Sequence, residues 1–102
     1  MNKIEEFAQN NYLSVRNVAA CVFLKLVVKN DVTATAKVEM LAQSERWQER
    51  DTAAFILLIL STEDYPWAKE RVASFLESNN AQERDTAKRI EALKNYLITS
   101  DT

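Results

Sequence analysis

The sequence predicts an all-α protein, and three observations carry this prediction. The chain of 102 residues contains no glycine and one proline, whereas sheet proteins need glycine in their tight turns. Apolar residues recur at helical spacing. A segment of 34 residues occurs three times, which is typical of a repeat architecture. We expect a single domain over residues 1–102, because this length is enough for one core.

The repeat is clearest in the hexapeptide QERDTA, which occurs at Gln48–Ala53 and again at Gln82–Ala87. A third, divergent copy is SVRNVA at Ser14–Ala19, and arginine and alanine keep their places in all three copies. Apolar positions on both sides of the hexapeptide also align at the same interval. The units are expected at about 1–30, 31–64 and 65–98.

Each unit carries a short and a long amphipathic pattern. In the second unit Ala34, Val38 and Leu41 follow the spacing of one helix face. Pro66 stands where the next short helix begins, a position at which a missing N–H costs little. The sequence predicts six helices, at approximately 2–10, 13–29, 32–43, 47–61, 66–78 and 81–98. Three antiparallel pairs of such helices, stacked side by side, make a small α-solenoid.

Differences between the copies predict the ends of the array. Lys25 aligns with Ile59 and Leu93 and is expected to face outward, where no unit precedes it. Positions that are apolar in the first two long helices but charged in the last are expected to face the following unit: Ala20, Ala54 and Lys88; Cys21, Phe55 and Arg89; Phe23, Leu57 and Glu91. Polar outer faces of this kind predict an array capped at both ends and a monomer.

Three segments, VRNVAACVFLKL, ERDTAAFILLIL and ERDTAKRIEALKNYL, resemble HEAT-like repeats. Those repeats often place an arginine, then an alanine and a leucine, along one helix of each unit, after a short polar turn. The resemblance covers about residues 1–98. It implies an α-solenoid, and it implies a scaffold that binds proteins.

The recurring arginines and aspartates of the hexapeptide have two interpretations. In the structural one, which we favour, arginine of one unit pairs with aspartate of a neighbouring unit, and alanine lets the helices approach closely. In the functional one, the arginines form a ladder that binds an acidic partner or phosphates. The residues of this repeat motif are Arg16, Arg50, Asp51, Arg84 and Asp85.

A second aligned set of cations lies on the short helices. Short helices usually line the concave surface of HEAT-like solenoids, so this set is a candidate partner-binding surface, although a solvated face is the simpler explanation. Tyr65 adds aromatic area beside it. Trp47 is expected to fill the seam between units. The candidate partner-binding residues are Lys3, Lys37, Trp67, Lys69 and Arg71.

The residue types needed for catalysis are scarce. The chain has no histidine and no glycine-rich phosphate loop, and its one cysteine, Cys21, is expected to be a buried structural thiol. We therefore expect no enzymatic activity, no metal and no cofactor. A single cysteine fits a reducing cytoplasm. The longest apolar run, AAFILLIL, is eight residues, too short to span a membrane.

We expect a non-enzymatic scaffold or adaptor that binds another protein through its short-helix face. One alternative is nucleic-acid binding, because SERWQERDTAAFILL also resembles the DNA-alkylation-repair branch of HEAT-like proteins, with Trp47 and Arg50 on its Trp-x-x-Arg pattern. The net charge of −2 argues against it. A third alternative is a small inhibitor or immunity-type protein.

Overall fold

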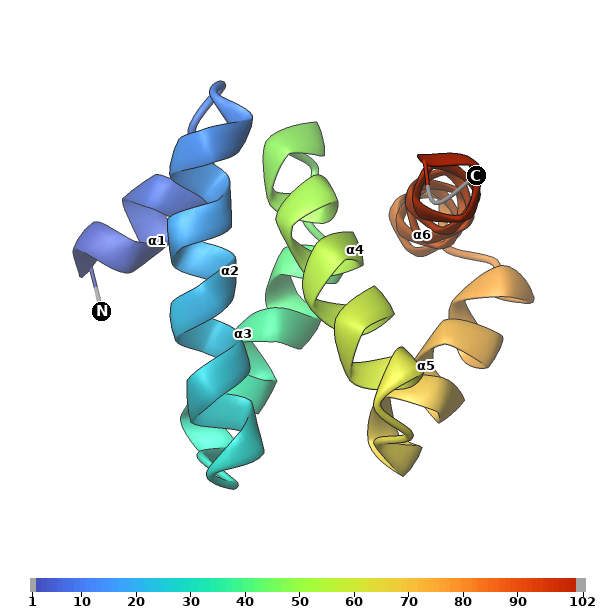
Figure 1. Ribbon diagram of the computed structural model, residues 1–102, viewed down its shortest axis with the longest axis horizontal. Helices are drawn as coiled ribbons and strands as arrows, with labels where there is room; N and C mark the ends of the chain where they lie inside the picture. The colour runs from blue at the N-terminus through green and yellow to red at the C-terminus, as the bar shows by residue number, and fades with distance from the viewer. Residues whose placement is uncertain (1, 101–102) are drawn as a thin grey trace.

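A computed structural model describes residues 2–100, with side chains from residue 3 to residue 96. Over these residues the chain forms six α-helices and no strand (Figure 1). The helices are α1 (Asn2–Ala8), α2 (Leu13–Val28), α3 (Val32–Ala42), α4 (Trp47–Thr62), α5 (Pro66–Leu76) and α6 (Ala81–Ser100). Their number and order agree with the prediction, and every boundary lies within two residues of the expected one.

The starts of the long helices follow the 34-residue interval of the sequence repeat. Leu13, Trp47 and Ala81 begin α2, α4 and α6, so successive long helices start 34 residues apart. The short helices α3 and α5 have 11 residues each, and α2 and α4 have 16 each. No described helix is both long enough and apolar enough to cross a membrane.

Local polar residues end and begin the helices in the absence of glycine. Asn30 and Asp64 follow α2 and α4 with a φ of 64°, the left-handed region that usually takes glycine. Asparagine and aspartate tolerate this region better than other residues with a Cβ. Asp31 then caps α3 by accepting a hydrogen bond from the Ala34 amide at 3.0 Å. Pro66 occupies the first turn of α5.

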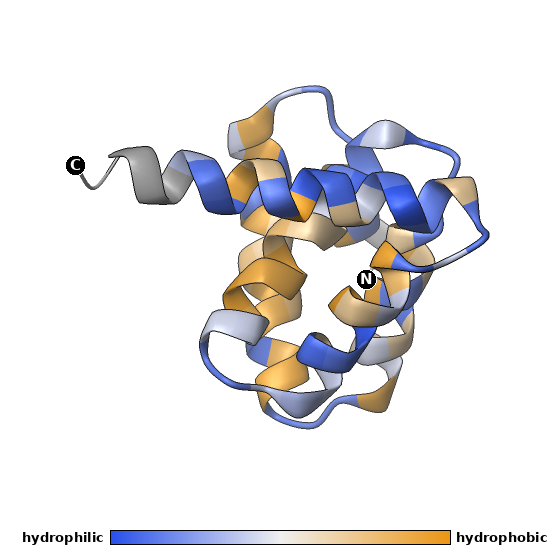
Figure 2. Cartoon of the chain, turned by 90° about the vertical axis from the view of Figure 1, so that its right-hand side faces the viewer, coloured by the Kyte–Doolittle hydropathy of each residue, from blue (hydrophilic) through white to orange (hydrophobic). Residues whose placement is uncertain are grey.

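Helix α4 is the centre of the fold, and it packs against each of the other five helices. In Figure 1, α2 and α4 run side by side in the plane of the view, whereas α6 is seen almost end-on. The last long helix therefore crosses α4 steeply. Figure 2 shows α6 lying across this end of the molecule with a largely hydrophilic outer side.

The core lies between α4 and the helices around it. Phe23 of α2, Ile56 of α4 and Phe75 of α5 are each at most 1% exposed. The hexapeptide alanines Ala53 and Ala87 are also buried. A side chain this small lets two helix backbones approach closely, so alanine at these positions fits the expected packing.

Cys21 corrects one expectation from the sequence. The thiol is exposed rather than buried, because this face of α2 points away from α4. The corresponding residue in the last unit, Arg89, reaches back to Asp51 of the preceding unit at 3.5 Å. The column that contains Cys21 and Arg89 therefore faces the preceding unit, and the sequence had assigned it to the following one. The two neighbouring aligned positions agree with the prediction. Ala20 and Phe23 are buried, whereas the aligned Lys88 and Glu91 are exposed.

The left-handed residue after α2 gives a test of this local structure. Asn30→Val should lower the free energy of unfolding by about 1 kcal/mol, because a β-branched residue is strained at positive φ. Asn30→Gly should leave it unchanged or raise it slightly. Urea unfolding followed by far-UV circular dichroism measures both, and equal effects of valine and glycine would contradict the helix-ending role.

Candidate functional site

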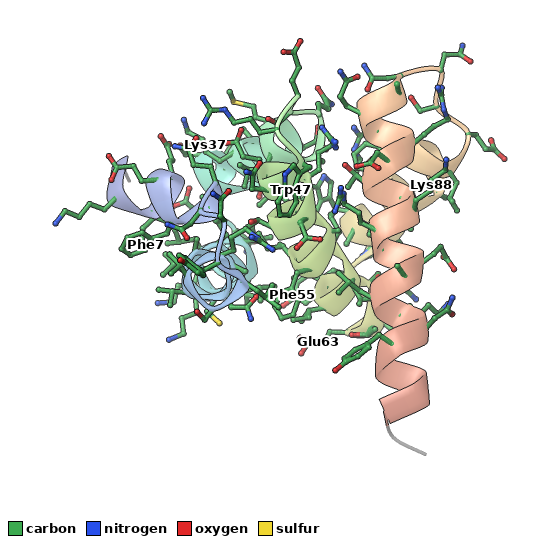
Figure 3. The ribbon with its side chains drawn as sticks, turned by 90° about the horizontal axis from the view of Figure 1, so that it is seen from above. Phe7, Lys37, Trp47, Phe55, Glu63 and Lys88 are labelled. Carbon is green, nitrogen blue, oxygen red and sulfur yellow. The ribbon has the colours of Figure 1, made fainter. Side chains whose placement is uncertain are left out.

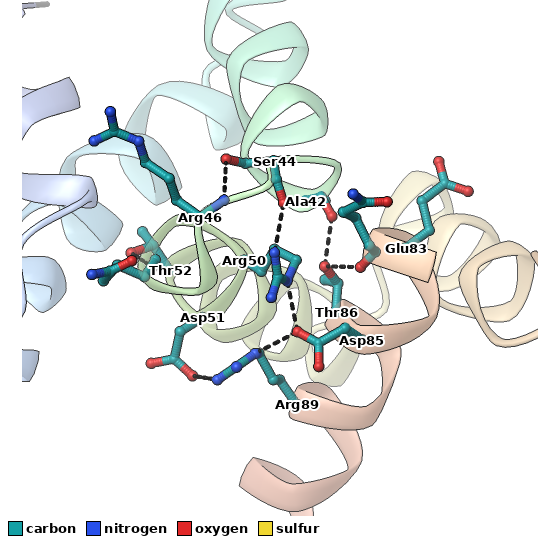
Figure 4. A network of polar contacts seen from close by, with 12 residues as sticks. Ala42, Ser44, Arg46, Arg50, Asp51, Thr52, Glu83, Asp85, Thr86 and Arg89 are labelled. Atoms are coloured by element: carbon teal, nitrogen blue, oxygen red, sulfur yellow. Dashed lines mark hydrogen bonds and ion pairs between the residues drawn. The ribbon is translucent and has the colours of Figure 1, made fainter. Parts of the chain in front are cut away.

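Arginine and aspartate of the hexapeptide join successive units, as the structural interpretation predicts. Arg16 of α2 contacts Asp51 of α4 at 2.9 Å. Arg50 of α4 contacts Asp85 of α6 at 2.6 Å, as Figure 4 shows. Arg16 is 5% exposed. A charge-assisted bond between partly buried groups is stronger than one at the surface, so these pairs hold neighbouring long helices in register.

The same arginines also fix the loop that leads into their own helix. Arg50 donates to the Ser44 carbonyl at 2.8 Å, and Arg84 donates to the Ser78 carbonyl at 2.9 Å. Arg16 donates to the carbonyls of Asn10 and Asn11. Each guanidinium thus closes the loop before its helix, and in the first two units it also reaches the next unit.

Threonine of the hexapeptide has a role that the sequence analysis missed. Thr52 is buried and donates its hydroxyl to the carbonyl of Ala8, at the end of α1, at 2.7 Å. Thr86 repeats this bond to Ala42, at the end of α3, at 2.6 Å. These carbonyls lie in the last turn of a helix, where the backbone lacks its usual partner. The first copy has Val18 at this position, which is 51% exposed.

Trp47 lies at the seam between units but is not buried there. The residue is 43% exposed, so Trp47 fills the seam only in part. Guanidinium groups of Arg16 and Arg89 lie 5.1 Å and 5.5 Å from the ring centre. Asp51 contacts both arginines, and the cluster therefore joins α2, α4 and α6 around the ring of Trp47, which is labelled in Figure 3.

Asp85 is the most strongly engaged carboxylate of this network. Its partial burial raises the pKa, but hydrogen bonds and charge from Arg50 and Arg89 outweigh burial, and the pKa lies below the ordinary 3.8. Arg50 and Arg89 contact it at 2.6 Å and 2.8 Å. The carboxylate is therefore held in its charged form between two helices.

The cations that were predicted to bind a partner are largely engaged within the chain. Lys37 of α3 contacts Glu5 of α1 at 2.8 Å, and Arg71 of α5 contacts Glu39 of α3 at 2.6 Å. Both pairs join successive short helices at the same interval, so they form a second ladder beside the arginine–aspartate one. A column of paired charges attracts an anionic partner weakly.

The two remaining cations of the candidate set differ from these. Lys69 contacts Asp64 at the start of α5, and its hydrogen bond and charge lower the pKa of that exposed carboxyl. Lys3 of α1 is exposed. The five candidate residues therefore do not gather into one cationic site.

Trp67 lines a groove on the short-helix side of the molecule. Its volume is about 570 Å³. Trp67 packs partly against the core, and its indole N–H donates to Glu39 at 3.3 Å. Val32, at the mouth, is 81% exposed. The lining residues are Val27, Asn30, Val32, Thr35, Ala36, Glu39, Tyr65 and Trp67.

The chemistry of this groove is that of a binding site for apolar groups. Its surface is mainly aliphatic and aromatic, with the Glu39 carboxylate and the Thr35 hydroxyl at its side. Glu39 is already neutralised by Arg71. Among the described residues, no three His, Cys, Asp or Glu side chains are placed to hold a metal ion.

Comparison with known proteins finds no family model, no curated protein and no solved structure that matches this chain. The HEAT-like resemblance therefore stays a prediction from the sequence.

The buried threonines can be tested by substitutions that keep their shape. Thr52→Val and Thr86→Val should each lower the free energy of unfolding by about 1 kcal/mol, because a hydroxyl donor to a helix-end carbonyl is lost. Chemical unfolding monitored by circular dichroism measures the change. Thr33→Val, on the exposed side of α3, is the matched control; losses no larger than its own would rule out this role.

Acid should weaken the contact between α4 and α6. The folded-state pKa of Asp85 lies below its unfolded value, so its contribution to stability is complete above the ordinary pKa of 3.8 and is lost as the pH falls through the folded pKa. Unfolding free energies measured down to acidic pH should fall less steeply in Asp85→Asn. Glu91→Gln, an exposed carboxylate on the same helix, is the control, and equal flattening by both substitutions would refute the assignment.

Proposed function

We propose that this chain is a non-enzymatic helical-repeat domain, a small α-solenoid of the HEAT-like kind, that binds another protein on its short-helix side. The occupant of the Trp67 groove is an apolar segment of that partner. The observation that carries the proposal is the groove itself, in which aromatic and aliphatic side chains of α2, α3 and α5 meet around a hollow of about 570 Å³. Grooves of this size and lining bind clusters of apolar side chains.

Two features support an apolar partner segment over an anionic one. Val32 stands at the mouth with 81% of its surface exposed, and the indole of Trp67 is held in place by Glu39. A fixed aromatic ring beside exposed aliphatic groups is typical of the residues that dominate binding energy. The cations Lys37 and Arg71, in contrast, already have carboxylate partners.

This distribution of charge also weakens the nucleic-acid alternative. Arg16 and Arg50, which an interpretation based on phosphate contacts would use, are bound to Asp51 and Asp85. Binding to phosphates derives most of its affinity from cations that are free to neutralise them. The groove, which is nearly uncharged, offers nothing comparable.

Site-specific photo-crosslinking tests the proposal. A benzoylphenylalanine in place of Ala36, which is exposed and lines the groove, should capture a discrete partner protein in the cells that express the chain. The same group in place of Gln43, exposed just beyond α3, should not. Val32→Glu should weaken binding of the purified partner about tenfold or more, whereas Met40→Glu on the same helix should not.

The outcomes separate the alternatives. Equal capture at positions 36 and 43, or binding that is unchanged by Val32→Glu, would exclude the groove. A gel shift of short DNA or RNA at low salt that fades as salt is added would replace the proposal with nucleic-acid binding.

A further inference from the structure

The aromatic side of the Trp67 groove lies where the third unit departs from the second. Tyr65 stands at the position of Asp31 in the repeat. Asp31 caps α3 with its carboxylate, whereas Tyr65, at the same place before α5, makes no such bond. Trp67 aligns with Thr33. Thr33 is exposed, whereas Trp67 is half-buried. At two lining positions the third unit therefore has aromatic side chains in place of polar ones.

The backbone has the same form in both units, so the difference lies in the side chains. Asn30 and Asp64 share a φ of 64°. Asp31 and Tyr65 follow them with φ of −73° and −72° and ψ of 108° and 114°. An aspartate at position 65 would therefore meet the geometry of an N-cap, which tyrosine cannot use. Departures of this kind from a favourable local pattern are expected at functional sites.

The opposite side of the groove is one face of α3. Val32, Thr35, Ala36 and Glu39 line the groove and follow one another at helical spacing. The first and last of them are about 10 Å apart along the helix axis. Ala36 is exposed and has only a methyl group, so a second helix can approach α3 closely there. This face matches about two turns of another helix.

The α3 side of the groove has little hydrogen-bonding capacity left. The Thr35 hydroxyl donates to the carbonyl of Asp31 at 3.1 Å. Glu39 accepts from the indole of Trp67 at 3.3 Å and contacts Arg71 at 2.6 Å. The peptide groups of the α3 wall are bonded within the helix.

This lining favours one backbone conformation for the occupant. An extended segment turns peptide N–H and C=O groups towards the lining, where they lose water and gain no partner. A helical segment satisfies its own peptide groups. The side-chain amide of Asn30 and the hydroxyl of Tyr65 have no hydrogen bond to another described residue. Two such groups can bond a polar side chain, but not a row of peptide groups.

We propose, on the basis of the proposed function, that the apolar segment bound in the Trp67 groove is an amphipathic α-helix that lies along α3. Its apolar side chains, three and four residues apart, pack against Tyr65 and Trp67. Its backbone lies close to Ala36.

Selection from a peptide library tests the proposal, because the library imposes no conformation. Random 12-residue peptides displayed on phage are selected on the wild-type chain, and those that also bind Val32→Glu are removed. The remaining peptides should carry apolar residues at i, i+3 or i+4, and i+7, without internal proline. Proline at a central, outward-facing position of a selected peptide should weaken its binding at least about tenfold in fluorescence anisotropy. Alanine there should not.

Variants of the chain locate the bound helix. Tyr65→Asp combined with Trp67→Thr gives the third unit the residues of the second, and it should weaken binding of a selected peptide at least about tenfold. Ala36→Trp, at an exposed position, should weaken binding to the same extent, because a large side chain keeps a helix away from α3. Met40→Trp, exposed on the same helix, is the matched control. Thermal unfolding checks that each variant is folded.

The results distinguish a failure of the helix from a failure of the groove. Peptides that depend on Val32 but tolerate central proline would overturn the helix and leave the proposed function intact. Unchanged binding to Ala36→Trp would overturn close packing along α3. If no selected peptide depends on Val32, the groove binds no apolar segment, and the proposed function falls as well.

Discussion

The ion pair between arginine of one long helix and aspartate of the next is the contact on which the other inter-unit contacts depend. It occurs twice, as Arg16 with Asp51 and Arg50 with Asp85, with the partners 35 residues apart in each case. Each arginine also closes the loop before its own helix. One side chain therefore fixes where a long helix begins and how it meets the next one. Because the guanidinium of Arg16 is 5% exposed, its removal would leave a partly buried carboxylate with less compensation.

This use of charge inside the chain determines which surfaces remain for a partner. Two ladders of ion pairs, one along the long helices and one along the short helices, engage most of the cations that align between units. The groove beside Trp67 is mainly apolar, and its one carboxylate, Glu39, is paired with Arg71. Specificity at apolar surfaces comes from shape and a few anchors, such as Trp67, more than from net charge.

Most of the fold, and part of the candidate site, can be predicted from the sequence. Helix boundaries follow from apolar spacing and from residues such as Pro66, and the arginine–aspartate pairs follow from the alignment of the copies. The role of Thr52 and Thr86 was missed, although Val18 at the aligned position of the first unit was a signal for it. Exposure of Cys21 and Trp47 could not be read from spacing, because periodicity defines the faces of a helix but not which neighbouring helix each face meets. The pairing of Lys37 with Glu5 and of Arg71 with Glu39 requires side-chain positions on two helices at once.

A double-mutant cycle on Arg16 and Asp51 measures the strength of this junction between α2 and α4. The free energies of unfolding of Arg16→Met, Asp51→Asn and the double variant are compared with that of the wild type. If the hexapeptide is a junction between units, the two substitutions are coupled by about 1 kcal/mol or more. If their effects add to within about 0.3 kcal/mol, the pair does not hold α2 and α4 together, and the hexapeptide is not a junction between units.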